Sequence, residues 1–215
     1  KEFDYIKIED NLLCVGAATP SGKLLSFCKK YDIKNFELLP KLPGNIGGMI
    51  KMNAGLKEYE IFNYLHSITT EHGIILKQDI KHGYRWTNFK GIVFEAKFEI
   101  HKGFNEEHLK MFKKMRDNQP SDASAGSCFI NPANDSAGRL IEMAGLKGHQ
   151  IGDMAFSSKH ANFLVNLGKG SFDEAIELIK LAQKKVYEKF GVCLENEIII
   201  IDERYKAGKA TLIKD

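Results

Sequence analysis

Seven consecutive residues combine side chains that could transfer a proton with residues that favour a turn. The run Gly126-Ser127-Cys128-Phe129-Ile130-Asn131-Pro132 holds a hydroxyl, a thiol and an amide. It is not the nucleophile elbow of a hydrolase, because the pattern G-x-S-x-G is absent. Ser127 could act as a proton donor or as a capping residue. Cys128 could act as a nucleophile if its surroundings stabilised the thiolate, but beside Phe129 a small buried hydrophobe is favoured.

Two charged positions could have either a functional or a purely structural role. Arg85 lies between Tyr84 and Trp86 in the segment 83–89, and stacking on a ring can hold its planar fork toward a carboxylate. A surface arginine packed across a ring gives the same pattern, and this segment alone favours that interpretation. Glu197 precedes an apolar run; it is either an inward carboxylate with a partner or an exposed acid at a turn.

A glycine-rich segment, residues 43–48, could approach a phosphate group. Its three glycines free the backbone to bring N–H groups close to phosphate oxygens. No Gly-Lys-Ser/Thr follows, so it is not a P-loop, and its spacing is not that of a dinucleotide fingerprint. A tight structural turn explains the same glycine content.

Histidine and cysteine spacings do not indicate a metal centre. The seven histidines show no H-E-x-x-H pattern, and the four cysteines form no C-x-x-C pair. We therefore predict no metal, reduced thiols and, with no signal peptide visible, a cytoplasmic protein. His160 and Asn162 flank the start of an expected strand, where either could bind a sugar or satisfy backbone groups.

Composition bounds the class of protein. The 215 residues are 43% hydrophobic and 27% charged, with a net charge of +3, which suits one large or two modest globular domains. So small a charge gives no reason to expect a nucleic-acid partner, and apolar runs such as 198–201 are too short to span a membrane. Because the chain begins at Lys1 and soon enters a strand-like segment, we expect that a preceding part of a longer protein is missing.

The hydrophobic pattern predicts the elements that must position these residues. Helices are expected over 21–31, with Ser21 as N-cap, and over 105–118, 136–144 and 171–190, the last opened by a capping box and ended by Gly191. Loops are expected at 42–48 and 119–134. Strands are expected over 12–18, 62–70, 74–78, 92–100, 161–167 and 198–201, with Ile92, Phe94, Ala96, Phe98 and Ile100 on one face of the fourth. The elements indicate an α+β fold without a βαβ rhythm.

In this order the motifs resemble those of the UDP-N-acetylenolpyruvoylglucosamine reductase family, bacterial flavoenzymes that complete UDP-N-acetylmuramic acid. The resemblance runs from about Gly16 to Ile201. The matching segments are Leu42-Pro43-Gly44-Asn45-Ile46-Gly47-Gly48 with Met52-Asn53-Ala54-Gly55, Tyr84-Arg85-Trp86-Thr87, the run from Gly126 to Pro132, Ala144-Gly145-Leu146-Lys147-Gly148, Lys159-His160-Ala161-Asn162-Phe163, and Leu194-x-x-Glu197.

The resemblance implies a domain organisation. Residues 1–103 would be the remainder of a two-lobed FAD-binding domain of the vanillyl-alcohol-oxidase type, with the family's first glycine-rich flavin loop before residue 1. Residues 104–201 would form a smaller α+β substrate-binding domain, and 202–215 a C-terminal tail. The short interval between Arg85 and Ser127 is similar to that of the shorter, second subtype of the family.

The resemblance also implies a reaction: NADPH reduces FAD, and the flavin passes hydride to the enolpyruvyl double bond of a UDP-sugar. Arg85 would polarise the substrate carboxylate, Glu197 would act on the same carboxylate when protonated or hydrogen-bonded, and Ser127 would protonate the carbanionic carbon. No obligate protein partner is implied. The implied cofactor contacts are Pro43, Gly44, Asn45, Gly47, Gly48, Asn53, Ala54 and Gly55, and the implied substrate contacts are Tyr84, Asn131, Lys147, His160 and Asn162.

The sequence departs from the family pattern at two positions. Ile130 stands where the family has a lysine, which removes one positive contact, and Thr87 stands where it has a serine, which keeps the hydroxyl. Two alternatives stay open. A flavoenzyme of the same superfamily could oxidise another alcohol or acid, against which the Ser127 and Glu197 motifs speak. A nucleotide-sugar-binding module without redox activity is the second.

Overall fold

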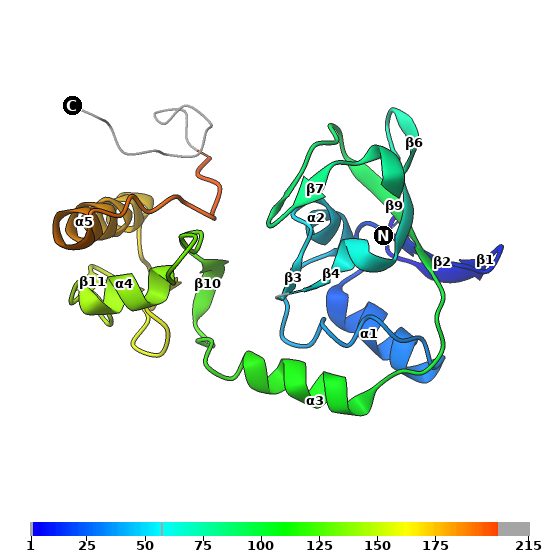
Figure 1. Ribbon diagram of the computed structural model, residues 1–215, viewed down its shortest axis with the longest axis horizontal. Helices are drawn as coiled ribbons and strands as arrows, with labels where there is room; N and C mark the ends of the chain where they lie inside the picture. The colour runs from blue at the N-terminus through cyan, green and yellow to red at the C-terminus, as the bar shows by residue number, and fades with distance from the viewer. Residues whose placement is uncertain (1, 57, 202–215) are drawn as a thin grey trace. The chain divides into compact units, whose positions relative to one another are not determined.

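The protein consists of two compact units that divide between Arg116 and Asp117. The structure is a computed structural model that describes residues 2–56 and 58–201 (Figure 1). The sequence predicts a boundary near residue 103, but the helix that follows it, α3 (Glu106–Met115), packs Phe112 into the hydrophobic core of the first unit. The predicted tail, 202–215, lies outside the described residues.

The first unit is built on a five-stranded antiparallel sheet in the order β1-β2-β9-β5-β6. Its buried face carries Leu13 and Val15, which pair with Phe98 and Ala96. The strands predicted near 12, 65 and 74 are confirmed, whereas β1, mostly exposed, gives no alternating signal. The strand bounds are β1 Ile6–Glu9, β2 Leu12–Gly16, β5 Leu65–Thr70, β6 Gly73–Leu76 and β9 Val93–Glu99.

Strand β9 forms as predicted, but the predicted alternation from Ile92 fails at its start. Ile92 is 68% exposed, whereas Val93 is buried. The pairing with β5 shifts between Thr69 and Thr70, which face Glu95 and Val93. This bulge places one extra residue of β9 opposite its partner and so reverses the alternation. Strict period-two counting from Ile92 cannot detect it.

Two helices accompany the sheet of the first unit. Helix α1 (Ser21–Lys30) is confirmed, but Ser21 is its first helical residue instead of its N-cap, and its hydroxyl donates to Leu42 O at 2.5 Å. The predicted loop 42–48 is too long, because helix α2 (Ile46–Lys51) begins inside it. The apolar pair Ile46 and Ile50, one turn apart, is fully buried as α2 packs on β2 and β9.

Short elements complete the first unit. Residues 62–64, predicted as strand, form part of the 3-10 helix η1 (Ile61–Tyr64), and a second 3-10 helix, η2, spans Lys77–Asp79. Helix α3 is capped by Asn105, whose side chain accepts from Glu107 N and His108 N. Two small hairpins are β3–β4 (Gly55–Leu56 and Tyr59–Glu60) and β7–β8 (His82–Gly83 and Trp86–Thr87).

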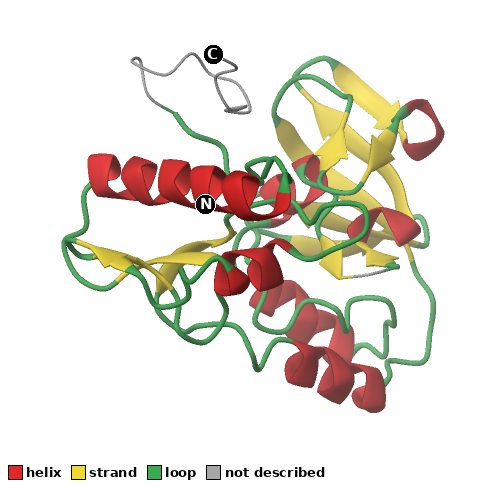
Figure 2. Ribbon diagram, turned by 60° about the vertical axis from the view of Figure 1, so that its left-hand side comes forward, coloured by secondary structure: helices red, strands yellow, loops and turns green. Residues whose placement is uncertain are grey.

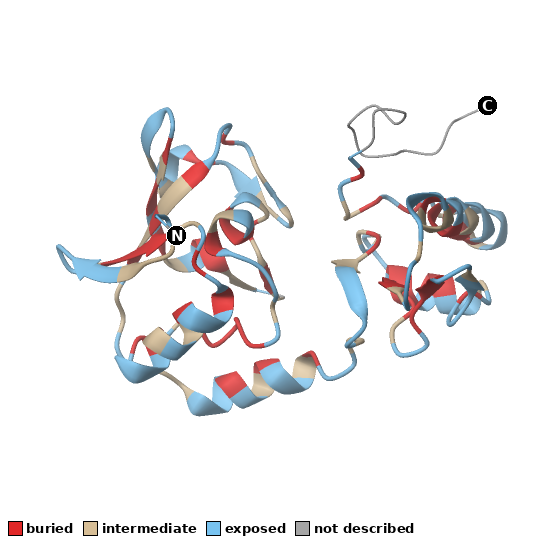
Figure 3. Ribbon diagram, turned by 180° about the vertical axis from the view of Figure 1, so that it is seen from behind, coloured by how far each residue is buried: buried red, intermediate tan, exposed pale blue. Residues whose placement is uncertain are grey.

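The second unit is a four-stranded antiparallel sheet in the order β10-β13-β12-β11, with helices packed against it. Helix α5 (Phe172–Phe190) lies over β11 and β12 and contacts α4 (Ala137–Met143) (Figure 2). Its capping box at Ser171 and Glu174 and its left-handed Gly191 are confirmed. Figure 3 shows buried residues along one side of α5 and exposed residues along the other. The strands are β10 Ala123–Ser127, β11 Gln150–Ile151, β12 Met154–Phe156 and β13 Phe163–Asn166.

Two predictions for the second unit are wrong. The predicted loop 119–134 contains strand β10, whose Ala-Ser-Ala-Gly-Ser sequence has no hydrophobic alternation and forms because β13 offers an edge. The predicted strand 198–201 does not form, and Ile199 and Ile201 are 74% and 86% exposed. An apolar run without a neighbouring strand cannot become a buried strand. Within the described residues no helix has both the length and the apolar character needed to cross a membrane.

Candidate active site

Arg85 occupies the turn of the β7–β8 hairpin in the first unit. Its backbone has φ 62°, a left-handed conformation that few side chains adopt without support. The guanidinium lies 4.8 Å from the centre of the Tyr84 ring, and Nη2 donates to Gly55 O at 3.0 Å. The prediction that an aromatic ring holds this arginine is confirmed for Tyr84. The indole of Trp86 instead covers Gly83, where an added Cβ would lie 2.6 Å from Nε1.

Ser127 ends strand β10 of the second unit, where it pairs with Phe163. The pairing is irregular between Ser124 and Ser127, and Gly126 has φ 92°, so the strand is bent at the serine. The next residue, Cys128, is fully buried, and burial, with the nearby charge of Glu197, raises the pKa of its thiol. The interpretation of Cys128 as a buried hydrophobe is therefore confirmed.

Glu197 lies on a segment that runs beside residues 128–130, which follow Ser127. Glu197 N donates to Cys128 O at 2.9 Å, Ile130 N donates to Glu195 O at 2.8 Å, and Phe129 forms a bridge with Asn196. These bonds fix residues 195–197 antiparallel to 128–130. Two of the three predicted catalytic residues are thus brought to neighbouring backbone positions within the second unit.

Asn162 holds the same segment from the other side. Its Oδ1 accepts from Phe129 N at 3.0 Å, its Nδ2 donates to Phe129 O at 2.8 Å, and the side chain is buried. Both polar groups of the amide are therefore bonded to backbone. The substrate contact expected at Asn162 stays a prediction: the backbone of Phe129 engages one N–H and one lone pair of the amide, which leaves a second N–H and a second lone pair.

The other predicted substrate residues of the second unit lie around α4. His160 is half-buried against Phe163, and its Nδ1 accepts from Asn162 N at 3.2 Å. Burial, and to a smaller extent the charge of Lys147, lowers the pKa of His160. Lys147 pairs with Glu142 at 2.9 Å. The Oδ1 of Asn131 accepts from Ala137 N at 3.0 Å, where α4 begins.

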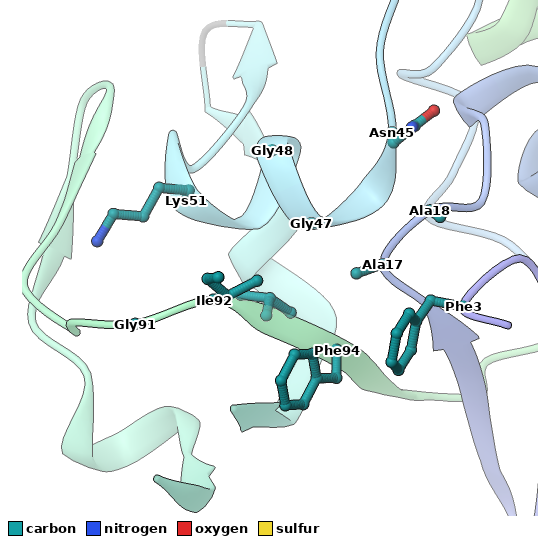
Figure 4. A pocket seen from close by; sticks show the side chains of 11 residues that line it. Phe3, Ala17, Ala18, Asn45, Gly47, Gly48, Lys51, Gly91, Ile92 and Phe94 are labelled. Atoms are coloured by element: carbon teal, nitrogen blue, oxygen red, sulfur yellow. The ribbon is translucent and has the colours of Figure 1, made fainter. Parts of the chain in front are cut away.

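A cavity of about 470 Å³ in the first unit lies against the glycine-rich segment (Figure 4). The rings of Phe3 and Phe94 stack there at 5.2 Å. A Cβ added to Gly48 would meet nothing within 4 Å, whereas one added to Gly47 would lie 2.9 Å from the Cβ of Ala17. The cavity is lined by Phe3, Ala17, Ala18, Asn45, Gly47, Gly48, Lys51, Gly91, Ile92, Val93 and Phe94.

Only part of the predicted cofactor set lines this cavity. Asn45, Gly47 and Gly48 do, whereas Pro43, Gly44 and Ala54 do not. Two further predicted contacts are enclosed in the protein: Asn53 is fully buried, and a Cβ on Gly55 would lie 2.4 Å from Tyr59 O.

Sequence reasoning missed Lys51, a cation at the cavity that donates to Phe89 O and lies 4.2 Å from the Phe89 ring centre. Its position one helical turn after Gly48 could have indicated it. Bare glycine backbone and one cation suit a phosphate, and stacked aromatic rings suit a flat apolar group. Within 2–56 and 58–201, no group of three or more metal-ligating side chains is arranged around a common point.

Residues 119–201 match the domain family described as "UDP-N-acetylenolpyruvoylglucosamine reductase, C-terminal domain". The chain is 48% identical over 204 residues to the UDP-N-acetylenolpyruvoylglucosamine reductase of Campylobacter jejuni strain RM1221, an alignment that covers 93% of this chain and 79% of the relative. The reductase of Helicobacter hepaticus is 43% identical over 201 residues, with 94% and 76% covered. The crystal structure of the Thermus caldophilus reductase superposes with a TM-score of 0.78 at 32% identity and covers 86% of this chain and 70% of that one. The chain therefore belongs to the UDP-N-acetylenolpyruvoylglucosamine reductase family of oxidoreductases.

Proposed function

We propose that the protein reduces the enolpyruvyl group of a UDP-N-acetylglucosamine enolpyruvate to give UDP-N-acetylmuramate, a peptidoglycan precursor, with NADPH as reductant and FAD as cofactor. Family membership supports the reaction. The observation that carries the assignment of residues is the pairing of 195–197 with 128–130, because it fixes Glu197 opposite Cys128, the residue that follows Ser127.

The cavity beside α2 supports FAD as the cofactor. Gly48 leaves open space where any side chain would intrude, and Lys51 supplies a cation for a diphosphate. Phe3 and Phe94 provide apolar surface for a ring system. We assign FAD contacts to Asn45, Gly47, Gly48 and Lys51. When bound, the flavin would take up reducing equivalents from NADPH and supply the hydride.

In the proposed reaction Arg85 binds the substrate carboxylate. Hydride addition to one carbon of the double bond leaves negative charge on the other, next to that carboxylate. A guanidinium there stabilises the transition state more than the ground state, because the charge grows toward it. The stacking of Arg85 on Tyr84 and its bond to Gly55 O support this role, since both restrict the guanidinium before substrate arrives.

Ser127 donates the proton that completes the reduction. A hydroxyl is a weak acid, so it protonates only a strongly basic carbon and only from a fixed position. The bend at Gly126 and the pairing with Phe163 support that fixed position. Glu197 hydrogen-bonds the same carboxylate that Arg85 binds. We assign substrate binding to Tyr84, Asn131, Lys147 and His160, whose side chains are exposed or half-buried.

The test uses the natural full-length protein. It should purify with the visible absorbance of oxidised flavin, which NADPH should bleach and the UDP-enolpyruvyl sugar should restore, with a product heavier by two hydrogens in mass spectrometry. Colourless protein that binds UDP-sugars would indicate a binding module instead. Flavin that NADPH reduces but this sugar does not reoxidise would indicate a different oxidoreductase.

A matched variant tests the arginine. Arg85→Lys keeps the positive charge but removes the planar fork. We expect flavin reduction by NADPH to be unchanged and reoxidation by the sugar to slow by about 100-fold, on the order of a lost charged hydrogen-bond pair. Near-normal reoxidation would remove Arg85 from its proposed role.

A further inference from the structure

Hydrogen bonds connect the segment 51–55 to the hairpin that carries Arg85. A two-stranded hairpin by itself is marginally stable in water, and β7–β8 pairs through only two register positions. Three bonds from different residues connect the hairpin to 51–55. They are Thr87 Oγ1 to Lys51 O at 2.9 Å, Asn53 Nδ2 to Gly83 O at 3.2 Å, and Arg85 Nη2 to Gly55 O at 3.0 Å.

Asn53 is the central residue of this connection. It is fully buried, and its backbone has φ 43°, a left-handed conformation that asparagine tolerates better than most residues. Its Nδ2 donates to Glu60 Oε2 at 2.7 Å as well as to Gly83 O. Both partners are acceptors, so the nitrogen of the amide must face them. Its Oδ1 is then left buried without a hydrogen-bond partner.

A buried acceptor without a partner destabilises the fold by about 1–3 kcal/mol. An apolar side chain at this position would avoid that loss, but it would release the Gly83 carbonyl. The arrangement therefore sacrifices some stability and keeps one donor directed at the hairpin. Strain and unsatisfied groups of this kind collect where a functional group must be held in place.

We infer that Asn53 is a positioning residue that fixes the Arg85 hairpin, with the Glu60 carboxylate orienting its amide, and that its side chain does not contact the cofactor. The inference rests on the proposed role of Arg85. It replaces the sequence-based assignment of Asn53 and Gly55 to the flavin.

Asn53→Asp tests the inference with almost no change in shape. Aspartate also tolerates the left-handed backbone, but it presents an oxygen to Glu60 and Gly83 O where a donor is needed. In the full-length enzyme we expect flavin content and reduction by NADPH to change less than twofold. Reoxidation by the UDP-enolpyruvyl sugar should slow by about 10- to 100-fold, the size of effect that a small misplacement produces. Glu60→Gln in the same protein should recover part of the loss, because its amide can donate to Asp at position 53.

Asn11→Asp is the matched control. Asn11 also has a left-handed backbone, φ 59°, but lies exposed in the turn between β1 and β2, and we expect it to leave both half-reactions unchanged. Loss of flavin from Asn53→Asp, or equal damage to both half-reactions, would show a cofactor contact and overturn the inference. Normal reoxidation would overturn it too.

A second measurement separates this inference from the proposed function. Trp86, the one tryptophan of these 215 residues, lies in the hairpin, so the anisotropy of the fluorescence that a Trp86→Phe variant lacks reports how firmly the hairpin is held. Asn53→Asp should lower the anisotropy, and Thr87→Val, which removes a different tether, should lower it less. If wild-type enzyme fails to reduce the sugar, the proposed function fails while this measurement still decides the positioning role. Unchanged anisotropy in both variants would contradict that role.

Discussion

Each unit of the protein holds its candidate catalytic segment with one buried asparagine, and the two asparagines are bonded differently. Asn162, in the second unit, uses both its amide oxygen and its amide nitrogen on the backbone of Phe129. Asn53, in the first unit, donates to Glu60 and Gly83, and its Oδ1 has no hydrogen-bond partner. Asn162 is therefore bonded through both its oxygen and its nitrogen, and Asn53 through its nitrogen alone.

This difference predicts which asparagine contributes mainly to the stability of the fold and which mainly positions a catalytic side chain. A buried amide that bonds backbone groups through both its oxygen and its nitrogen stabilises the fold, because its removal leaves those groups unpaired. The Ser127 segment is in addition part of a four-stranded sheet and continues into residues that pair with 195–197. Several independent sets of hydrogen bonds therefore fix its position. The Arg85 hairpin has only short strands of its own. We therefore expect changes at Asn162 to reduce stability, and changes at Asn53 to reduce catalysis with less effect on stability.

The largest effect should come from Ser127→Ala. If the strand that carries Ser127 is fixed by its own pairing, removal of the hydroxyl should abolish proton transfer and leave the fold unchanged. We expect reoxidation of the flavin by the UDP-enolpyruvyl sugar to slow by about 10²- to 10⁴-fold, the usual contribution of a general acid. Flavin reduction by NADPH and the melting temperature should be unchanged, as stopped-flow absorbance and thermal melting would show.

Cys128→Ala is the matched control for the serine. It should lower stability through the loss of a buried side chain and keep most of the activity. Equal slowing of both half-reactions by Ser127→Ala would mean that the hydroxyl supports the site without donating the proton.

The next effect is on stability, from Asn162→Ala. It leaves the N–H and the carbonyl of Phe129 unpaired in the interior, so the free energy of unfolding should fall by about 2–5 kcal/mol. Asn162→Asp keeps an acceptor for the N–H and should fall between wild type and alanine. Urea denaturation measures both. A loss below about 1 kcal/mol, together with weaker binding of the UDP-sugar, would support the substrate contact that the family resemblance implies.

Local signals made part of this architecture predictable. Helix α5 carries its start in Ser171 and Glu174 and its end in Gly191, all within one segment, and it forms as predicted. The β5–β6 hairpin is also local. Strand β10 carries no such signal, because it exists only through its pairing with β13. The bulge in β9 likewise depends on a partner strand far away in sequence.

The same contrast between local signals and distant partners applies to the candidate site. The roles predicted for Arg85, Ser127 and Glu197 came from the family resemblance of their motifs, because each residue taken alone fitted a structural role as well, and these roles stay predictions. The hydrogen bonds of Asn53 and Asn162 could not be predicted from sequence, because their partners Gly83 and Phe129 lie about thirty residues away along the chain. A motif residue with a polar side chain looks the same whether it binds a ligand or a distant carbonyl.

A smaller effect should come from two adjacent glycines of the first unit. Gly47→Ala places its Cβ against Ala17, so it should lower stability. Gly48→Ala places a methyl in open space at the cavity, so stability should hold or rise by about 0.5–1 kcal/mol. FAD should nonetheless dissociate more readily from Gly48→Ala, with Kd raised about tenfold, which corresponds to about 1.4 kcal/mol. Unchanged flavin affinity in this variant, measured by fluorescence titration, would place the cofactor elsewhere.

The smallest effect should be a pH dependence of the stability of the second unit. It should act through the hydrogen bond between His160 and Asn162. Nδ1 of His160 accepts from Asn162 N, and an imidazolium has no acceptor, so protonation breaks this bond. Burial, more than the charge of Lys147, sets the pKa of His160 below its ordinary value of 6.5. The unfolded chain then binds the proton more readily than the folded one. The stability that the neutral ring contributes is present above pH 6.5 and is lost as the pH falls through the folded pKa.

Because the ring is half-buried and partly screened by solvent, this loss should stay below about 1 kcal/mol. Urea denaturation at about pH 7.5 and about pH 5.5 would measure it, with His160→Gln as the variant that lacks the titrating group. The wild type should lose stability on acidification relative to His160→Gln, while Asn53→Asp in the first unit should leave that difference unchanged. An equal acid response in wild type and His160→Gln would show that protonation of His160 does not weaken the support of Asn162.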